Sequence, residues 1–322
     1  MRLGVLLMVL VLTGLCSLLV GDWPLAPAEI WQGLMTGHPQ ISEVILQIRL
    51  PRMVLALLMG MALGGAGAAL QALFQNPLAD PGVLGVSGVA AFAAALGISA
   101  GAAGLWAIGG YAVLGAAIGG LVLVLAASVA RQTVTLVLFG AGLASLAGSG
   151  TALVFNLSPT PVTTAEMMNW LMGSVAHRDW RHVGVMAVGA SVGLGILMAL
   201  RRPLDMLRLG EETATSLGVQ VRLVRLWVIA GVSILSGLAV AVAGVVGFVG
   251  LAAPHVVRGL VRPPERQIMP MAALMGGGLT VMADLGVRLI PTDAELKLGV
   301  ITALLGAPIL MVIALRYREV RP

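Results

Sequence analysis

The stretch RRPLDMLRLGEETATSLGVQVRLVR, residues Arg201–Arg225, interrupts a chain that is apolar for long distances on both sides of it. It carries eight of the 33 charged residues of the chain. Within it, Glu211–Leu217 is predicted to form a short helix, because two acids lie in its first turn and Gly218 follows as a C-cap. Two interpretations are open: a solvated loop between membrane helices, or a cytoplasmic element on which another protein docks.

The composition around this segment is typical of a membrane protein. Of the 322 residues, 59% are hydrophobic and 10% are charged, and the mean hydropathy is +1.01, whereas a soluble domain has about 25% charged residues. Apolar runs of about 20 residues recur along the chain and do not alternate with polar residues, which favours helices. We therefore expect an all-α polytopic membrane protein with a single transmembrane domain, residues 1–322, and a cytoplasmic coupling segment at about 201–222.

Ten membrane spans are predicted from the hydropathy pattern, so both termini lie on one side of the membrane. The predicted spans are 3–20, 51–74, 83–100, 106–130, 133–156, 180–200, 223–243, 246–262, 268–290 and 295–316. With the N-terminus inside, 13 basic residues lie on the inner side and six on the outer side. By the positive-inside rule, Arg201–Arg225 and both termini are then cytoplasmic.

Small residues recur at four-residue spacing in these spans. In lipid, such residues let two helix backbones approach closely, so they are expected to mediate helix packing. Examples are Gly60/Gly64, Gly115/Gly119 and Ala116/Gly120.

Several kinds of chemistry are excluded. The only lysine is Lys297, and no G-x-x-x-x-G-K-[ST] loop is present to hold the phosphates of ATP. The four histidines are scattered and Cys16 is the only cysteine, so no metal site or disulfide is indicated. We expect no enzyme activity and no cofactor in this chain. If transport is driven by ATP, then ATP and Mg²⁺ bind to a separate ATPase subunit.

Two groups of charged residues lie where a purely apolar span would not need them. Asp284 falls inside the ninth span, one helical turn before Arg288, so the two side chains share a face. Either they form a local ion pair, or Asp284 is the proton-relay carboxylate of an ion-coupled secondary transporter. Arg49 and Arg52 share a face at the outer start of the second span; they either snorkel to headgroups or form a positive rim for an acidic partner.

The segment after the second span contains capping residues. Pro77 ends the helix, and Asp80 can N-cap the third span with Pro81 at its first position. Capping does not require Asn76 or Leu78, so these two residues are candidates for another role.

Several motifs, in one order along about residues 20–318, resemble the permease family that imports iron-siderophores, haem and vitamin B12. They are Arg49–Arg52 (RLPR), Gln71–Ser87 (QALFQNPLADPGVLGVS), Leu209–Glu212 with Ser216–Gly218, Gly247–Arg258 (GFVGLAAPHVVR), Ala283-Asp284 and Ala294–Pro308. The resemblance implies a type II ABC importer permease of about ten helices in the bacterial inner membrane. It also implies a dimer around a central path, two cytoplasmic ATPase subunits and a periplasmic substrate-binding protein.

The resemblance further implies roles for individual residues. The residues implied to couple the permease to the ATPase are Leu207, Leu209, Gly210, Glu211, Glu212, Ala214, Ser216, Leu217 and Gly218. The residues implied to dock the binding protein are Arg49, Arg52 and Arg288. The residues implied to form the inner gate are Asn76, Leu78, Thr133, Val134 and Thr135. Around the coupling residues, Arg201, Arg202, Arg222 and Arg225 are expected to be flanking charges at the membrane surface.

Two positions depart from the family pattern. Gly88 stands where a second serine is usual, and Lys297 replaces a proline. Met168–Gly173 with Asp179–Arg181 is somewhat similar to vitamin B12 permeases, but haem and siderophore members share much of it. The substrate therefore stays open among these three classes.

The function expected from this resemblance is the permease subunit of an ATP-driven importer of an iron chelate, haem or vitamin B12. Its expected partners are two ATPase subunits, a periplasmic binding protein, lipid and a second permease, with a homodimer favoured over a paralogue; nucleic acid is not expected. The rival functions are an ion-coupled secondary transporter that uses Asp284, and a membrane scaffold without substrate flux.

Overall fold

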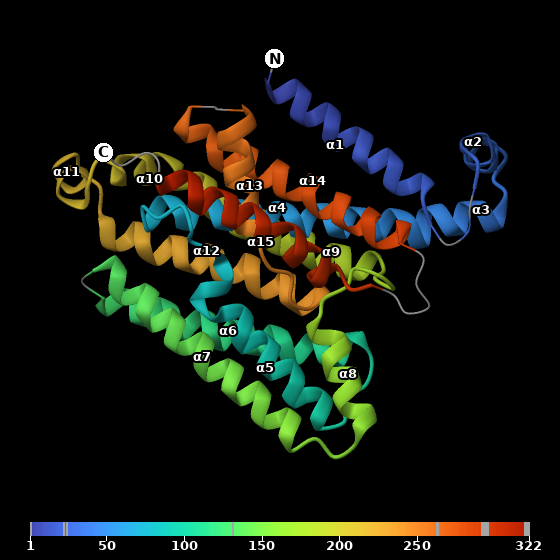
Figure 1. The fold of residues 1–322 in the computed structure, drawn as a ribbon, viewed down its shortest axis with the longest axis horizontal. Helices are drawn as coiled ribbons and strands as arrows, with labels where there is room; N and C mark the ends of the chain where they lie inside the picture. Colours follow the sequence, from blue (N-terminus) through green and yellow to red (C-terminus); the bar gives the residue numbers. More distant parts are fainter. Residues whose placement is uncertain are drawn as a thin grey trace.

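The computed structural model describes residues 2–21, 23, 25–130, 132–261, 264–290 and 296–318, and the regular elements in these ranges are helices (Figure 1). The helices that correspond to the ten predicted spans are α1 (Arg2–Leu19), α4 (Leu50–Leu73), α5 (Val86–Ser99), α6 (Leu105–Val129), α7 (Thr133–Asn156), α9 (Trp180–Ala199), α12 (Val221–Ala243), α13 (Val249–Val256, extended by η3, Val257–Val261), α14 (Ile268–Leu289) and α15 (Leu298–Arg318). Six of the helices are long and apolar enough to cross a membrane, and four shorter apolar helices complete the set. The predicted polytopic all-α fold of about ten spans is therefore confirmed.

Short helices connect these spans. They are α2 (Pro27–Thr36), α3 (Pro39–Glu43), η1 (Val44–Arg49), η2 (Pro81–Leu84), α8 (Pro161–Leu171), α10 (Arg201–Leu207), α11 (Glu211–Ser216) and η4 (Glu265–Gln267). Asp80 caps η2, where its carboxylate accepts a hydrogen bond from the Gly82 backbone N–H at 2.8 Å. The prediction that Asp80 caps the third span directly is corrected in this respect, because the 3-10 turn precedes α5.

The helix α4 lies at the centre of the bundle, against α9, α12, α13 and α14 (Figure 1). Its small residues allow this contact, as the four-residue spacing predicted. A Cβ atom on Gly60 would lie 2.2 Å from the carbonyl oxygen of Gly276 on α14, and one on Gly64 would lie 2.2 Å from another α14 carbonyl. On Gly67, a Cβ would lie 1.9 Å from the carbonyl oxygen of Gly250 on α13.

The helices α5, α6 and α7 form a second layer, which α12 joins to the centre (Figure 1). A Cβ on Gly115 of α6 would lie 2.6 Å from the Val89 carbonyl oxygen of α5. A Cβ on Gly237 of α12 would lie 2.4 Å from the Cβ of Ala116 on α6. The predicted small-residue packing of α6 is therefore present on two of its sides.

The two ends of the bundle carry different short elements. Figure 1 shows α10 and α11 at one end, beside the start of α12, while α2, α3 and α8 lie at the opposite end. We call these the coupling end and the far end. The position of each candidate site follows from this division.

Candidate functional site

The polar stretch Arg201–Arg225 contains two short helices, α10 and α11, at the coupling end. α10 ends at Leu207, and Gly210, with φ of 103°, turns the chain into α11. Gly218, with φ of 86°, ends α11, and the Val219 N–H donates to the Ala214 carbonyl at 3.0 Å. Both glycines occupy the left-handed region, which other residues rarely adopt. The predicted short helix and its glycine cap are therefore present.

This segment has an exposed side and a buried side. Leu209 is 63% exposed, and Glu212 and Leu217 are exposed as well. Leu207 and Ala214 are buried and fix the segment to the bundle. Two exposed leucines beside an acid make a surface that another protein can cover.

Arg225 links this segment to the rest of the bundle. The residue is 3% exposed, which corrects the expectation that it is a flanking charge at the membrane surface. Its Nη1 donates to the Ala130 carbonyl oxygen at 2.8 Å, and its Nη2 pairs with Glu211 Oε1 at 3.1 Å. Ala130 is the C-cap of α6. Sequence reasoning missed this contact because the three residues lie far apart in the chain.

Two further contacts hold α10. The Gln75 side-chain amide donates to the Leu207 carbonyl oxygen, and Arg208 pairs with Glu265 ahead of α14. Asp205 lies on the same helix. Burial raises the pKa of its carboxyl, and the nearby positive charge of Arg208 opposes this shift. The base of the coupling segment is therefore attached to the chain after α4 and to η4.

The residues predicted for the inner gate lie at the same end of the bundle. Asn76 follows α4, and its side-chain oxygen accepts the Leu78 N–H at 2.9 Å. Thr133 begins α7, and Leu78 and Val134 are exposed. Thr135 lines a cavity of about 790 Å³ between α6 and α7. These positions are compatible with a gate, and the role stays a prediction.

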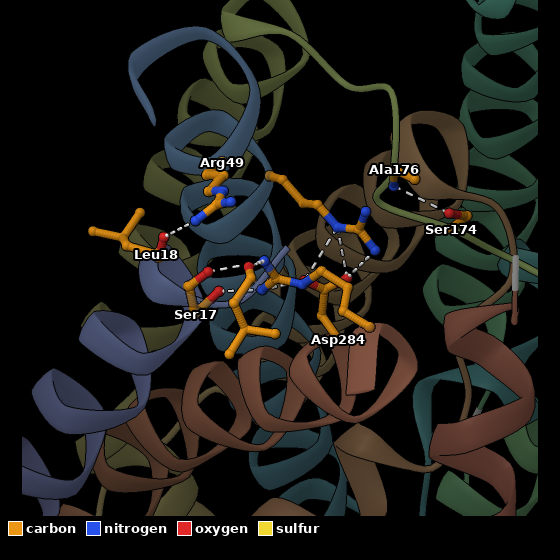
Figure 2. Close-up of polar contacts among 9 residues, drawn as sticks. Ser17, Leu18, Arg49, Ser174, Ala176 and Asp284 are labelled. Carbon is orange, nitrogen blue, oxygen red and sulfur yellow. Dashed lines mark hydrogen bonds and ion pairs between the residues drawn. The ribbon is translucent and has the colours of Figure 1, made fainter. Parts of the chain in front are cut away.

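Asp284 is an acid buried inside the bundle, 1% exposed. Its Oδ2 pairs with Arg288 Nη2 at 3.0 Å, which confirms the predicted ion pair on α14. Its Oδ1 pairs with Arg52 Nη2 on α4 at 2.9 Å, which sequence reasoning did not predict. The carboxylate therefore joins two helices (Figure 2).

Arg49 and Arg288 hold the end of α1. Arg49 Nη1 donates to the Leu18 carbonyl oxygen at 2.7 Å, as Figure 2 shows. Arg288 Nη1 donates to the carbonyl oxygens of Ser17 at 2.8 Å and Val20 at 2.7 Å. The last four carbonyls of a helix lack partners within it, so these guanidinium groups act as a C-cap. All three arginines predicted for docking thus lie together at the far end, and their docking role stays a prediction.

A cavity of about 260 Å³ lies at the same end, between the start of α6 and α8. Its polar lining includes Glu166, Asn169, Ser174, His177, Arg178 and Lys297. Nearby, Asp179 caps α9: desolvation opposes its ionisation, but hydrogen bonds from His182 prevail and lower the Asp179 pKa. Ala294 and Glu295, which belong to the family motif around Lys297, lie outside the described residues. Within the described ranges, no three His, Cys, Asp or Glu residues gather as a metal site.

The chain is similar to known transport proteins over nearly its whole length. The family model of the FecCD transport family matches residues 8–316. The uncharacterized ABC transporter permease protein YvrB of Bacillus subtilis is 38% identical over 289 residues, which are 87% of this chain and 81% of YvrB. The vitamin B12 import system permease protein BtuC of Escherichia coli O6:H1 is 37% identical over 321 residues, 98% and 94% of the two chains.

The fold of the chain is also similar to that of a solved transporter structure. An inward-facing conformation of a metal-chelate type ABC transporter superposes with a TM-score of 0.88 at 31% identity. The superposition covers 98% of each chain. The arrangement of helices around α4 is therefore shared with a transporter of that type.

Proposed function

Because the chain belongs to the FecCD transport family, we propose that it is the permease subunit of an ATP-driven importer of an iron chelate, haem or vitamin B12. The vitamin B12 permease of Escherichia coli and the metal-chelate transporter structure support this range of substrates. The chain is a transport subunit, and ATP with Mg²⁺ binds to a partner. Residues 1–322 form one transmembrane unit in the bacterial inner membrane, with both termini cytoplasmic.

The observation that carries this proposal is the coupling segment at the end of the bundle. Its exposed leucines and Glu212 form a surface for an ATPase subunit, and its buried residues attach that surface to the spans. When ATP closes the two ATPase subunits, the segment moves and the permease switches access from one side to the other. The inner gate is formed by the residues at Asn76–Leu78 and Thr133–Thr135.

A second copy of the permease completes the path. The α7 helix has large apolar side chains exposed along its length, whereas α12 is mostly buried. These exposed residues include Val134, Leu138, Leu146 and Leu153. A homodimer covers part of this face and encloses a weakly polar path, which suits a bulky chelate; lipid covers the remainder.

The periplasmic binding protein docks at the far end through its acids. Arg52 has the most exposed of the guanidinium-bearing side chains in the Asp284 cluster, 15% against 5% for Arg288. An acid on the partner reaches Arg52 first, and it must compete with internal acceptors for Arg49 and Arg288. Asp284 supplies one negative charge to both Arg52 and Arg288, and Arg49 donates to neutral carbonyls, so positive charge is left at the far end to attract an acidic partner.

Reconstituted transport tests the proposal. The permease is assembled with its ATPase and binding protein in proteoliposomes, and uptake of vitamin B12, haem and iron-siderophore is measured with and without ATP. Uptake of one of these substrates should require ATP and both partners. Uptake that persists without the ATPase but collapses with the proton gradient would instead favour the secondary transporter.

Variants of the exposed surface sharpen this test. Glu212→Lys and Leu217→Glu should reduce co-purification of the ATPase, because both change the surface without touching the buried anchors. Thr151→Val, on α7 away from this surface, is the control. Unchanged co-purification and uptake in both variants would place ATPase docking elsewhere.

A further inference from the structure

Arg225 makes two contacts that belong to different functional parts of the molecule. One is with Glu211, the first residue of α11 in the coupling segment. The other is with the carbonyl oxygen of Ala130, which ends α6 three residues before Thr133. A single guanidinium therefore spans from the coupling segment to the segment that opens α7.

The two sides of this contact differ in burial. The Arg225 side chain is 4% exposed, whereas the Glu211 side chain is 47% exposed, so the guanidinium is held inside the bundle while water reaches its acidic partner. A charge-assisted hydrogen bond of this kind is about twice as strong as a neutral one. A buried guanidinium that loses an acceptor is left unsatisfied, which is unfavourable, so movement of Glu211 favours a matching displacement of Arg225 and of the Ala130 carbonyl.

A second contact, a neutral hydrogen bond from an exposed residue, reaches the other gate segment. Gln75 donates its side-chain amide to the Leu207 carbonyl at the end of α10. Gln75 directly precedes Asn76, and its φ of 48° lies in the left-handed region. A non-glycine residue persists there only when its surroundings hold it, which indicates a tightly held position.

We propose that Arg225 and Gln75 are positioning residues that transmit movement of the coupling segment to the two segments of the inner gate. Arg225 acts on Ala130 and hence on the start of α7, and Gln75 acts on Asn76. This inference rests on the proposed function, because it assumes that an ATPase moves the coupling segment.

The planar guanidinium group of arginine suits the two contacts made at position 225. Its planar fork donates from two nitrogens in fixed directions, so it can hold Glu211 and the Ala130 carbonyl together. A lysine keeps the charge but presents one compact ammonium group at the end of a flexible stem. Arg225→Lys should therefore preserve the charge in this position and weaken the link.

The experiment uses the complete importer, with permease, ATPase and binding protein, in proteoliposomes. Variants are Arg225→Lys and Gln75→Leu, and the control is Arg266→Lys, an exposed arginine elsewhere at the same end. All samples carry Cys16→Ser, because Cys16 is a free, exposed cysteine that would also react. Spin labels on a cysteine at Thr213 report the coupling segment, and labels at Val134 report the start of α7. Transport and ATP hydrolysis are measured on the same samples.

In the control, ATP should shift the distance distributions at both labels. In Arg225→Lys, the Thr213 label should still respond to ATP, while the response at Val134 shrinks. Molecules transported per ATP should fall by roughly 2- to 30-fold, the range expected when a coupling contact is weakened. In Gln75→Leu, the corresponding loss is expected for a label at Leu78.

Several outcomes would overturn the inference. If the Val134 label responds to ATP in Arg225→Lys as it does in the control, the contact does not transmit movement. If Arg225→Lys loses ATPase binding or folded yield while transport per ATP is unchanged in the surviving complex, the role of Arg225 is structural only. Failure of the proposed function gives a different result, because neither label would then respond to ATP in the unmodified protein.

Discussion

Replacement of Asp284 by asparagine tests the ion-pair cluster between α4 and α14. The change keeps the size of the side chain but removes its charge, so the guanidinium groups of Arg52 and Arg288 lose their shared counter-ion. Both arginines are largely buried, with 15% of the Arg52 side chain and 5% of the Arg288 side chain exposed.

The magnitude follows from the geometry. At 2.9 Å for the Arg52 contact, Coulomb's law with an effective dielectric constant of about 20 gives roughly 6 kcal/mol of attraction before desolvation is subtracted. Removal of one partner from a buried pair typically costs about 3–5 kcal/mol. Asparagine can still accept one hydrogen bond, so we expect a loss near the lower value, about 3 kcal/mol.

The assay is the free energy of unfolding in mixed micelles, measured by titration with a denaturing detergent. Glu265→Gln is the matched control, because the Arg208–Glu265 pair is more exposed and should lose at most about 1 kcal/mol. Adding Arg52→Met to Asp284→Asn should recover part of the loss, since it removes one unpaired cation. Arg288 is left intact because it also holds the α1 carbonyls.

A loss below about 1 kcal/mol for Asp284→Asn would refute the reasoning, because it would equal that of an exposed pair. Uptake by the folded fraction of this variant separates the two earlier interpretations. A structural ion pair predicts that this fraction still transports with ATP. A proton relay predicts that transport is abolished.

Three further predictions concern other parts of the chain. Arg52→Gln should lower the affinity for the binding protein more at low than at high salt, measured with immobilised permease at two ionic strengths. An unchanged affinity at low salt would exclude the hypothesis that the outer arginines form a positive rim for this partner. The folded pKa of Asp179 is depressed, so its contribution to stability is full above the unfolded value of 3.8 and disappears as the pH falls through the lower folded pKa. The stability difference between the unmodified protein and Asp179→Asn should therefore shrink below pH 3.8 and stay constant at neutral pH, in unfolding titrations across this range. Gly67→Ala should reduce the yield of folded protein in size-exclusion profiles, because its Cβ would lie 1.9 Å from the Gly250 carbonyl, whereas Gly142→Ala meets open space and should be tolerated.

The spans could be predicted from sequence because each is a continuous apolar run with a polar or proline-containing boundary. α7 illustrates this, since its predicted and observed bounds are both 133–156. Two of the short connecting helices illustrate what the apolar pattern does not indicate. α8 begins with Thr160 as N-cap and Pro161 at its first position, a helix start without a long apolar run. α10 follows α9 after Leu200 alone, and Arg201 and Arg202 at its start were expected only as flanking charges at the membrane surface.

The candidate site was predictable only where partners are close in the sequence. The Asp284–Arg288 pair follows from a separation of four residues on one helix. The partner of Arg225 at Ala130 is 95 residues away, and no local pattern indicates which carbonyl a buried guanidinium will meet. Burial of Arg225 itself was also hidden, because an arginine beside an apolar span normally reaches the membrane surface.

The cap on α1 has a consequence for the order in which the protein is assembled in the membrane. Arg288 lies 271 residues after Ser17, so ribosomal synthesis must reach α14 before that hydrogen bond can form. Arg49 becomes available much earlier, 31 residues after Leu18. During biogenesis, α1 is therefore secured in two stages, and its attachment to Arg288 waits until α14 has left the ribosome.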